Sequence, residues 1–297
     1  MGRHGAGHRA ACDLCRRAAA TAPQSGHPAG RTGGASGMST ANRAAGRFTG
    51  RKALITGAGG GIARALALRL AEEGASLALT DLDPARAHDA AQAVQAIGGS
   101  AVSLAADVTD RAAVETMVTQ SARAMGGIDI LVTCAGGYTA YTRFDEIDPD
   151  DWDRVIALNL RSVFLCCSAV LAHMKQAGRG RIINLGSLAG RSTSAGSSPA
   201  HYAAAKAAVS LMTQYLAKDT APYGITANTV APGTTRTDRV NALLTPEKEA
   251  AFARMTPMGR LAEPADIVGT IVFLASDDAA YVTGTTIDVN GGRLMLV

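Results

Sequence analysis

TGAGGGIARAL, residues Thr56 to Leu66, is the stretch that decides the fold. It connects the apolar run KALIT, 52–56, to the helical pattern GIARALALRLAEEG, 61–74. Glycines between a strand and a helix allow a tight turn, and they let the backbone approach a pyrophosphate that sits against the exposed N–H groups of the helix N-terminus. A P-loop would need Lys and then Ser or Thr after the glycines, and neither follows them here. We therefore expect a dinucleotide-binding turn.

The acidic residue Asp81 indicates which dinucleotide this turn accepts. It ends the second apolar run, SLALTD, twenty residues beyond Gly61. A carboxylate at this point accepts hydrogen bonds from a ribose 2′-hydroxyl and repels a 2′-phosphate. Leu82 follows, and no arginine stands at that position or inside the glycine turn, although Arg64 lies just beyond it. We expect NAD as the cofactor, with NADP as the alternative.

Short apolar runs alternate with helical stretches along the rest of the chain. The expected strands are 52–56, 76–81, 101–108, 128–136, 181–187, 225–233 and 285–289, and the expected helices include 61–74, 83–99, 109–127 and 148–178. Asp83, Asp148 and Ser198 each precede a proline, which is typical of a helix start. Strands without polar alternation, each followed by a helix, predict a parallel sheet covered on both faces. The fold class is therefore α/β, a single Rossmann-type doubly wound domain of about seven strands.

The charge of the chain divides unevenly at about residue 47. Residues 1–47 contain seven Arg and one acid, whereas 48–297 contain 22 basic and 24 acidic residues. A nearly neutral folded part argues against nucleic acid or an acidic membrane as its partner. Few large apolar residues stand in 1–47, so we expect a disordered leader, or a chain whose translation starts at Met38. The domain then covers 48–297.

The five cysteines bear on metal binding and on location. An odd number, without a secretory hydrophobic segment, is typical of reduced thiols in a cytoplasmic protein. Cys12 and Cys15 form a lone CxxC pair without a second pair at zinc-site spacing, so we expect no metal site. The longest apolar runs, 163–172 and 267–275, are about half the length that spans a bilayer, which favours buried helices.

One tyrosine and one lysine stand in the alanine-rich stretch PAHYAAAKAAV, which begins at Pro199. Tyr202 and Lys206 are four residues apart, a spacing that stacks both side chains on one face of a helix. An ammonium about 4 Å from a phenol favours the phenolate by about 4 kcal/mol at an effective dielectric near 20, or roughly three pK units. Such a pair can supply a base near neutral pH. A Tyr–Lys pair at this spacing is common, so whether it is catalytic depends on the other motifs in the sequence.

Those companions, in chain order, give the sequence a family resemblance. The motifs are TGAGGGIA at 56–63, Asp107-Val108, CAG at 134–136, Asn159, Ser187, YAAAK at 202–206, APG at 231–233 and YVTGTTIDVNGG at 281–292. Together they resemble the short-chain dehydrogenase/reductase family over about residues 48–297, and look most similar to its bacterial 3-oxoacyl-carrier-protein reductase branch. The resemblance implies a homotetramer that acts on a small-molecule alcohol or ketone.

The resemblance also implies roles for particular residues. Tyr202 would exchange a proton with the substrate oxygen, Ser187 would hydrogen-bond that oxygen, and Lys206 would hold the nicotinamide ribose and lower the pKa of Tyr202. Asn159 would position a water that links Lys206 to solvent. The cofactor would contact Tyr202 and Lys206, together with Gly57, Gly61, Ile62, Asp81, Asp107, Val108, Ala135, Gly136, Pro232, Gly233, Thr235 and Thr237.

Substrate specificity is expected in the long charged insertion 234–264, because such excursions from a compact domain are often functional lids. Tyr138, Tyr141, Arg143 and Arg191 are further candidate substrate contacts, each equally consistent with a solvent-facing position. The expected activity is NAD(H)-dependent interconversion of a secondary alcohol and a ketone. An NADPH-dependent 3-oxoacyl thioester reductase is the alternative, and a non-enzymatic nucleotide sensor on the same fold is a more distant one.

Overall fold

The computed structural model describes residues 46–193, 198–242 and 244–295. The expectations for a disordered leader, a start at Met38 and the Cys12–Cys15 pair lie outside these residues. In the described part, seven strands form one parallel sheet with the order β3-β2-β1-β4-β5-β6-β7. Their bounds are β1 Lys52–Thr56, β2 Ser76–Asp81, β3 Ser100–Ala105, β4 Ile130–Thr133, β5 Gly180–Leu185, β6 Ile225–Pro232 and β7 Thr286–Val289. The predicted strand pattern and the doubly wound sheet are confirmed.

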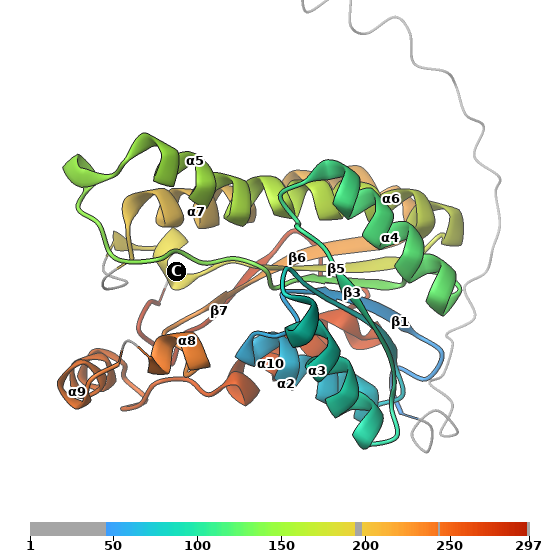
Figure 1. Cartoon of the computed structure of the whole chain (residues 1–297), viewed down its shortest axis with the longest axis horizontal. Helices are drawn as coiled ribbons and strands as arrows, with labels where there is room; N and C mark the ends of the chain where they lie inside the picture. The colour runs from blue at the N-terminus through green and yellow to red at the C-terminus, as the bar shows by residue number, and fades with distance from the viewer. Residues whose placement is uncertain (1–45, 194–197, 243, 296–297) are drawn as a thin grey trace, which may run out of the picture. The chain divides into compact units, whose positions relative to one another are not determined.

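Helices cover both faces of the sheet (Figure 1). The first face carries α2 Gly61–Glu72, α3 Pro84–Ala96 and α10 Pro264–Ala275, and the second carries α4 Arg111–Met125, α5 Pro149–Ile156, α6 Ser162–Ala177 and α7 Ala200–Thr220. Each face buries its own apolar cluster against the strands. Because both faces are covered, the central strands β1 and β4 have only apolar residues in their interiors, and polar residues stand only at their ends.

Two of the three predicted helix caps are present. Asp83 and Asp148 each accept a hydrogen bond from the backbone N–H two residues ahead, at 2.9 and 2.8 Å. The prediction for Ser198 is wrong, because α7 begins one residue later and Pro199 is its N-cap. The hydroxyl of Ser198 lies instead 3.4 Å from the hydroxyl of Tyr138.

The helical run from α5 to α6 is interrupted by a π-turn, η3 Ala157–Arg161. Such turns shift the register of the side chains that follow and are frequent at functional sites. Here the turn contains Asn159, which is completely buried. By length and hydropathy, Pro149–Ala177 is the one run in the described residues that could cross a membrane. A core helix meets the same criterion, and α6 buries seven residues, including Cys166 and Val170.

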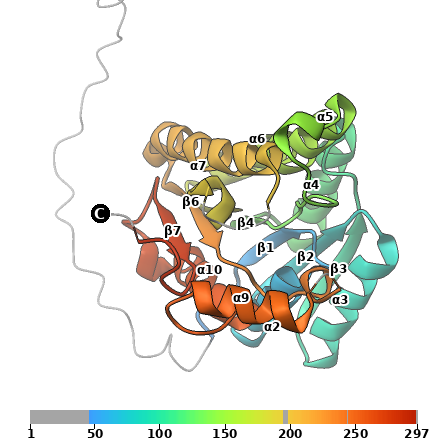
Figure 2. The same ribbon diagram turned by 90° about the vertical axis from the view of Figure 1, so that its left-hand side faces the viewer.

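The insertion between β6 and α10 contains two helices, α8 Asp238–Asn241 and α9 Pro246–Met255, with residue 243 outside the described part. They lie beyond the carboxyl ends of the strands (Figures 1 and 2). Arg236 pairs with Glu249 of α9 and, at 3.2 Å, with Glu263. Thr235 and Ala262 form an isolated parallel bridge that brings the two ends of the insertion together. The start of the insertion, including α8, contributes to the cavity lining, and the function of the segment as a lid stays a prediction.

Candidate active site

A cavity of about 540 Å³ opens at the carboxyl ends of the strands. Ligands bind at this edge in open α/β sheets. The cavity is lined by every residue predicted to contact a cofactor, and by the predicted catalytic residues Ser187, Tyr202 and Lys206. Asn159 is the one predicted site residue that lies behind the lining rather than in it.

The glycine turn at one side of the cavity fits a dinucleotide. Gly57 has φ +65°, and a β-carbon there would lie 2.8 Å from the backbone nitrogen of Ala135. The helix α2 begins at Gly61 without a side-chain cap, so its first N–H groups are available to an anion. A β-carbon at Gly61 would lie 3.2 Å from the methyl carbon of Thr237, across the cavity. The turn therefore leaves room for a pyrophosphate where a larger residue would fill it.

Asp81 lies at the end of β2, beside this turn. One of its oxygens accepts a hydrogen bond from the backbone N–H of Gly59 at 3.0 Å, and the other accepts from Asp83 at 3.2 Å. Its position agrees with the expected contact to an adenosine ribose. Asp107 and Val108 line the same end of the cavity, with the Asp107 carboxylate bonded to Thr109.

Sequence reasoning missed Arg86 at this end. Its guanidinium donates to the carbonyl of Gly59 at 2.8 Å, so Arg86 and Asp81 both flank Gly59. The residue is five positions beyond Asp81, on α3, whereas the search for a phosphate-binding arginine covered only Leu82 and the glycine turn. Arg64, the cation considered from sequence, is exposed and is not part of the cavity lining.

Ser187, Tyr202 and Lys206 converge at the opposite end, just beyond β5. The Ser187 side chain lies close enough to Tyr202 to lower the pKa of the phenol, and the Lys206 ammonium donates to the carbonyl of Leu185 at 2.8 Å. The Lys206 nitrogen is 5.8 Å from the centre of the Tyr202 ring. The predicted helical stacking thus brings the three residues together.

The titration of this group differs from the sequence-based expectation. Burial raises the pKa of Tyr202 above its ordinary value, and the Ser187 hydrogen bond and the charge of Arg239 act in the opposite direction. Lys206, which was expected to lower this pKa, directs its ammonium at the Leu185 carbonyl. Burial lowers the pKa of Lys206 itself to about 8. Tyr202 is therefore a phenol at neutral pH in the protein alone.

Asn159 acts on the site indirectly, by hydrogen bonds to the backbone of the loop after β4. Its side chain accepts from the N–H of Gly137 at 2.7 Å and donates to the carbonyls of Gly137 and Val155 at 2.8 and 2.9 Å. A β-carbon at Gly136 would lie 2.8 Å from the Asn159 oxygen and 3.2 Å from the Lys206 nitrogen. The asparagine therefore fixes the loop that passes directly beside Lys206.

The four candidate substrate contacts have different positions. Tyr138 lines the cavity, with its ring centre 4.7 Å from that of Tyr202. Tyr141 is exposed, and Arg143 pairs with the neighbouring Asp145. Arg191 pairs with Asp288 at 3.2 Å and is not part of the cavity lining. Tyr138 alone of the four lines the cavity.

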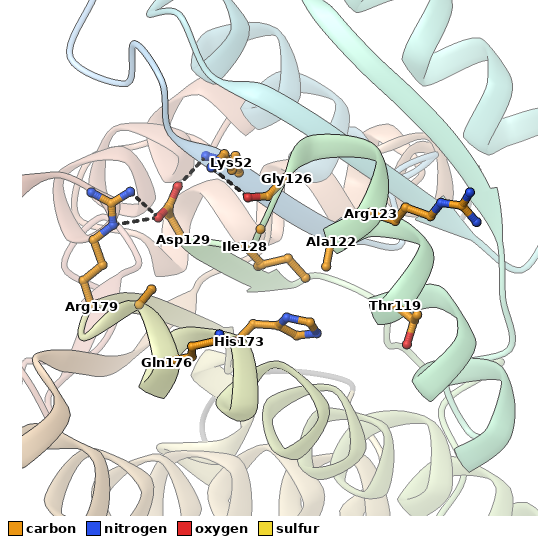
Figure 3. A pocket seen from close by; sticks show the side chains of 12 residues that line it. Lys52, Thr119, Ala122, Arg123, Gly126, Ile128, Asp129, His173, Gln176 and Arg179 are labelled. Carbon is orange, nitrogen blue, oxygen red and sulfur yellow. Dashed lines mark hydrogen bonds and ion pairs between the residues drawn. The ribbon is translucent and has the colours of Figure 1, made fainter.

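A second cavity, of about 590 Å³, lies at the amino-terminal edge of the sheet (Figure 3). Its buried carboxylate, Asp129, accepts from the backbone N–H of Lys52 at 3.0 Å and pairs with Arg179 at 2.8 Å. The Lys52 ammonium donates to the carbonyl of Gly126 at 3.0 Å. These groups join the starts of neighbouring strands. None of the predicted catalytic and cofactor residues lines this cavity.

Comparison with known proteins agrees with this geometry. A family profile described as Enoyl-(Acyl carrier protein) reductase matches residues 57–293. Cyclohexanol dehydrogenase of Rhodococcus sp. (strain TK6) is 40% identical over 258 residues, which cover 82% of this chain and 96% of that protein. The 3-oxoacyl-(acyl-carrier-protein) reductase FabG of Vibrio cholerae is 40% identical over 248 residues, 83% of this chain and 98% of that protein.

Solved structures match over the same region. Levodione reductase superposes with a TM-score of 0.79 at 34% identity, covering 83% of this chain and 98% of that one. A 3-oxoacyl-(acyl-carrier protein) reductase with bound NAD from Brucella melitensis has a TM-score of 0.77 at 34% identity, with 84% and 95% covered. These proteins are similar to the chain in sequence and in fold.

Proposed function

The chain belongs to the short-chain dehydrogenase/reductase family of oxidoreductases, which act on CH–OH groups with NAD or NADP, and we propose that it is an NAD(H)-dependent enzyme that interconverts a secondary alcohol and a ketone. One observation carries the proposal. A single cavity presents Ser187, Tyr202 and Lys206 at one end and Asp81 beside the glycine turn at the other. The cavity extends from Asp81 to Tyr202, which suits a dinucleotide with its adenosine near Asp81 and its nicotinamide near Tyr202.

The bound nicotinamide would supply or accept the hydride on the substrate carbon. The proton transfer that accompanies the hydride transfer is carried out by residues of the chain. In reduction, Tyr202 donates its phenolic proton to the ketone oxygen as the carbon receives the hydride, so a C–H and an O–H bond form and the C=O double bond becomes single. In oxidation, the same atoms move in reverse. Ser187 hydrogen-bonds the reacting oxygen and stabilises the charge that develops on it.

Substitution of Tyr202 tests the reaction. With NADH and a panel of cyclic and linear ketones, Tyr202→Phe should lower kcat by at least about 100-fold, in the range that general acid–base catalysis contributes. Its dissociation constant for NADH, measured by fluorescence titration, should stay within about threefold of the wild type. Unchanged turnover in Tyr202→Phe would exclude the assigned role.

Asp81 supports NAD as the preferred cofactor. Its carboxylate would accept the ribose hydroxyls and repel a 2′-phosphate. NADH should therefore bind at least tenfold more tightly than NADPH, a difference of about 1.4 kcal/mol, and Asp81→Ala should reduce that ratio. Equal or tighter binding of NADPH by the wild type would overturn the assignment.

A second candidate is an NADPH-dependent 3-oxoacyl thioester reductase. The specific observation in its favour is Arg86, whose guanidinium lies beside Gly59 where it could pair with a 2′-phosphate. The relative from Vibrio cholerae bears the name of such a reductase. Arg86→Met separates the candidates: a loss of affinity confined to NADPH, together with turnover of an acetoacetyl thioester, would favour the second one.

We also propose that the protein is a homotetramer and that it is located in the cytoplasm. Phe164 of α6, and Leu211 and Tyr215 of α7, are more than half exposed on one helical layer, which supports contact with partner subunits through these helices. The thiols of Cys134, Cys166 and Cys167 are free, which agrees with a reducing compartment. Light scattering after gel filtration tests assembly, and a monomer at micromolar concentration would exclude it.

A further inference from the structure

Arg239, on α8, is a cation in the cavity that the proposed reaction does not use. Its guanidinium makes no hydrogen bond or ion pair with the residues that the structure describes, whereas Arg236 and Arg260 in the same insertion are both paired with acids. Asp238 precedes it, but adjacent helical positions do not face each other, and no ion pair joins the two. Arg239 is exposed and forms part of the cavity lining, so its N–H donors are available to a molecule that fills the cavity.

The guanidinium lies on the side of the cavity where Tyr202 stands. Its central carbon is 5.1 Å from the centre of the Tyr138 ring, and that ring centre is 4.7 Å from the centre of the Tyr202 ring. The two distances place the guanidinium carbon at most about 10 Å from the Tyr202 ring centre. The glycine turn also lies near this helix, because a β-carbon at Gly61 would be 3.2 Å from the methyl carbon of Thr237, the N-cap of α8. The contact with Tyr138, which in turn contacts Tyr202, favours the molecule that reacts at Tyr202 over the pyrophosphate as the partner of Arg239.

The neighbouring backbone is shaped to admit this guanidinium. A side chain at Gly137 would collide with Arg239, and Gly137 has φ +138°, which other residues rarely adopt. Asn159 holds Gly137 in place through both of its backbone polar groups. Thr237 caps α8 by accepting from the N–H of Val240 at 3.4 Å, which orients the helix that carries Arg239. The position of the arginine is thus supported from two elements far apart in the sequence.

We propose that Arg239 determines substrate specificity by binding a carboxylate of the substrate, so that the enzyme acts on secondary alcohols and ketones that carry an acid group. A guanidinium presents paired N–H donors that match the two oxygens of a carboxylate. The guanidinium lies over the face of Tyr138, with its central carbon 5.1 Å from the ring centre, and this cation–π contact helps to hold it beside the cavity. This inference rests on the proposed function, because it names the substrate class of the same site.

Matched substrate pairs test the proposal. The probes are 3-hydroxybutanoate and 4-hydroxycyclohexanecarboxylate, each compared with its methyl ester, at saturating NAD. The wild type should favour the acid by at least tenfold in kcat/KM in one or both pairs. Arg239→Met, which keeps an unbranched side chain without the charge, should remove the preference for the acid through KM. Arg239→Lys should retain part of the preference.

A control variant removes the same charge from the same insertion. Arg254 lies on the exposed surface of α9, outside the cavity. The variant Arg254→Met should therefore keep the wild-type preference for the acid over the ester. NADH binding is measured for all variants. Should Arg239→Met weaken NADH binding tenfold or more and leave the acid preference intact, the arginine serves the cofactor and the proposal is overturned. Preference for the esters in both pairs by the wild type would overturn it as well.

A binding measurement separates this inference from the proposed function. Cyclohexanecarboxylate, which has no reacting hydroxyl, is titrated calorimetrically into the wild type and Arg239→Met in the presence of NADH. Binding that weakens at least tenfold in the variant supports the inference, even if no alcohol or ketone is turned over and the proposed function fails. Equal binding by both proteins, or no binding to the wild type at millimolar concentration, would overturn the inference while leaving the proposed reaction in place.

Discussion

Asn159 holds the backbone of Gly137 by both of its polar groups, accepting from the N–H at 2.7 Å and donating to the carbonyl at 2.8 Å. The side chain is completely buried and comes from the π-turn of the long helix. The loop that it fixes separates Lys206 on one side from Arg239 on the other. Asn159 therefore organises the site by positioning the loop, in addition to the water-holding role that the family resemblance implies.

Removal of this side chain should damage both stability and activity. Asn159→Ala leaves buried backbone groups of Gly137 unpaired, at a cost of about 2–4 kcal/mol in the free energy of unfolding, and should lower kcat at least tenfold. Asn228 is an equally buried asparagine that also bonds one carbonyl and one N–H, at 2.8 and 3.2 Å, in β6. Urea unfolding and steady-state kinetics should show that Asn228→Ala loses similar stability and keeps its kcat. Equal loss of kcat in both variants would contradict the local role.

Gly136 should tolerate no side chain. A β-carbon there would lie 2.8 Å from the Asn159 oxygen and 3.2 Å from the Lys206 nitrogen, both of which are held by hydrogen bonds. Gly136→Ala should therefore lower kcat/KM by tenfold or more. Gly269, in α10, has open space beside it, and Gly269→Ala should keep full activity and gain up to about 1 kcal/mol of stability. Wild-type kinetics in Gly136→Ala would show that the loop moves freely.

The two reaction directions should depend differently on pH. Burial raises the pKa of Tyr202, so the phenol that donates a proton in reduction is present at neutral pH, and the phenolate that accepts one in oxidation forms only at higher pH. The rate of alcohol oxidation should rise from pH 7 to pH 10, while ketone reduction stays level and then falls. Profiles of kcat/KM in both directions measure this. An oxidation rate that is level across the range would contradict it.

Removal of the Arg239 charge should move this profile. The guanidinium opposes the effect of burial on the pKa of Tyr202, so that pKa should rise further in Arg239→Met. The alkaline limb of oxidation, followed with a neutral alcohol such as cyclohexanol, should shift to higher pH. Arg254→Met is the control and should leave the limb in place. A shift to lower pH in Arg239→Met would exclude an electrostatic influence of this arginine on Tyr202.

Lys206 should make stability depend on pH. Burial lowers its pKa from 10.5 to about 8, so between these values the unfolded chain binds a proton that the folded protein does not. Raising the pH through this window therefore favours the folded state. The buried thiols act in the opposite direction above pH 9, because burial raises the pKa of Cys134 to about 12.

A comparison with Lys206→Met removes the contributions of Cys166 and Cys167, since both proteins contain them, whereas the Cys134 contribution changes because the Lys206 charge lowers the pKa of that thiol. The stability of the wild type relative to the variant should increase by up to about 1.4 kcal/mol per pH unit between pH 8 and pH 10. Urea unfolding at pH 7, 8, 9 and 10 gives the difference at each pH. A difference that stays constant would show that Lys206 keeps an ordinary pKa in the folded protein.

Local signals explain what the sequence could predict. Glycines after a strand, an acid at a strand end and a Tyr–Lys pair on a helix are each defined by neighbours in the chain, and all of them line one cavity. Arg239 and Arg86 were missed because their meaning depends on Gly137 and Gly59, which are far away in sequence and close in space. The Ser198 cap was predicted from a dipeptide pattern that the start of α7 does not follow.

The bridge between Thr235 and Ala262 has a consequence for how such an enzyme can evolve. Backbone bonds from Arg236 to Ala262 and from Ala262 to Thr234, at 2.8 and 3.1 Å, close the insertion at its base, so β6 and α10 meet whatever the intervening residues are. Changes in length or composition beyond that base need not disturb the sheet. Selection can therefore exchange the substrate while the proton-transfer chemistry is inherited intact.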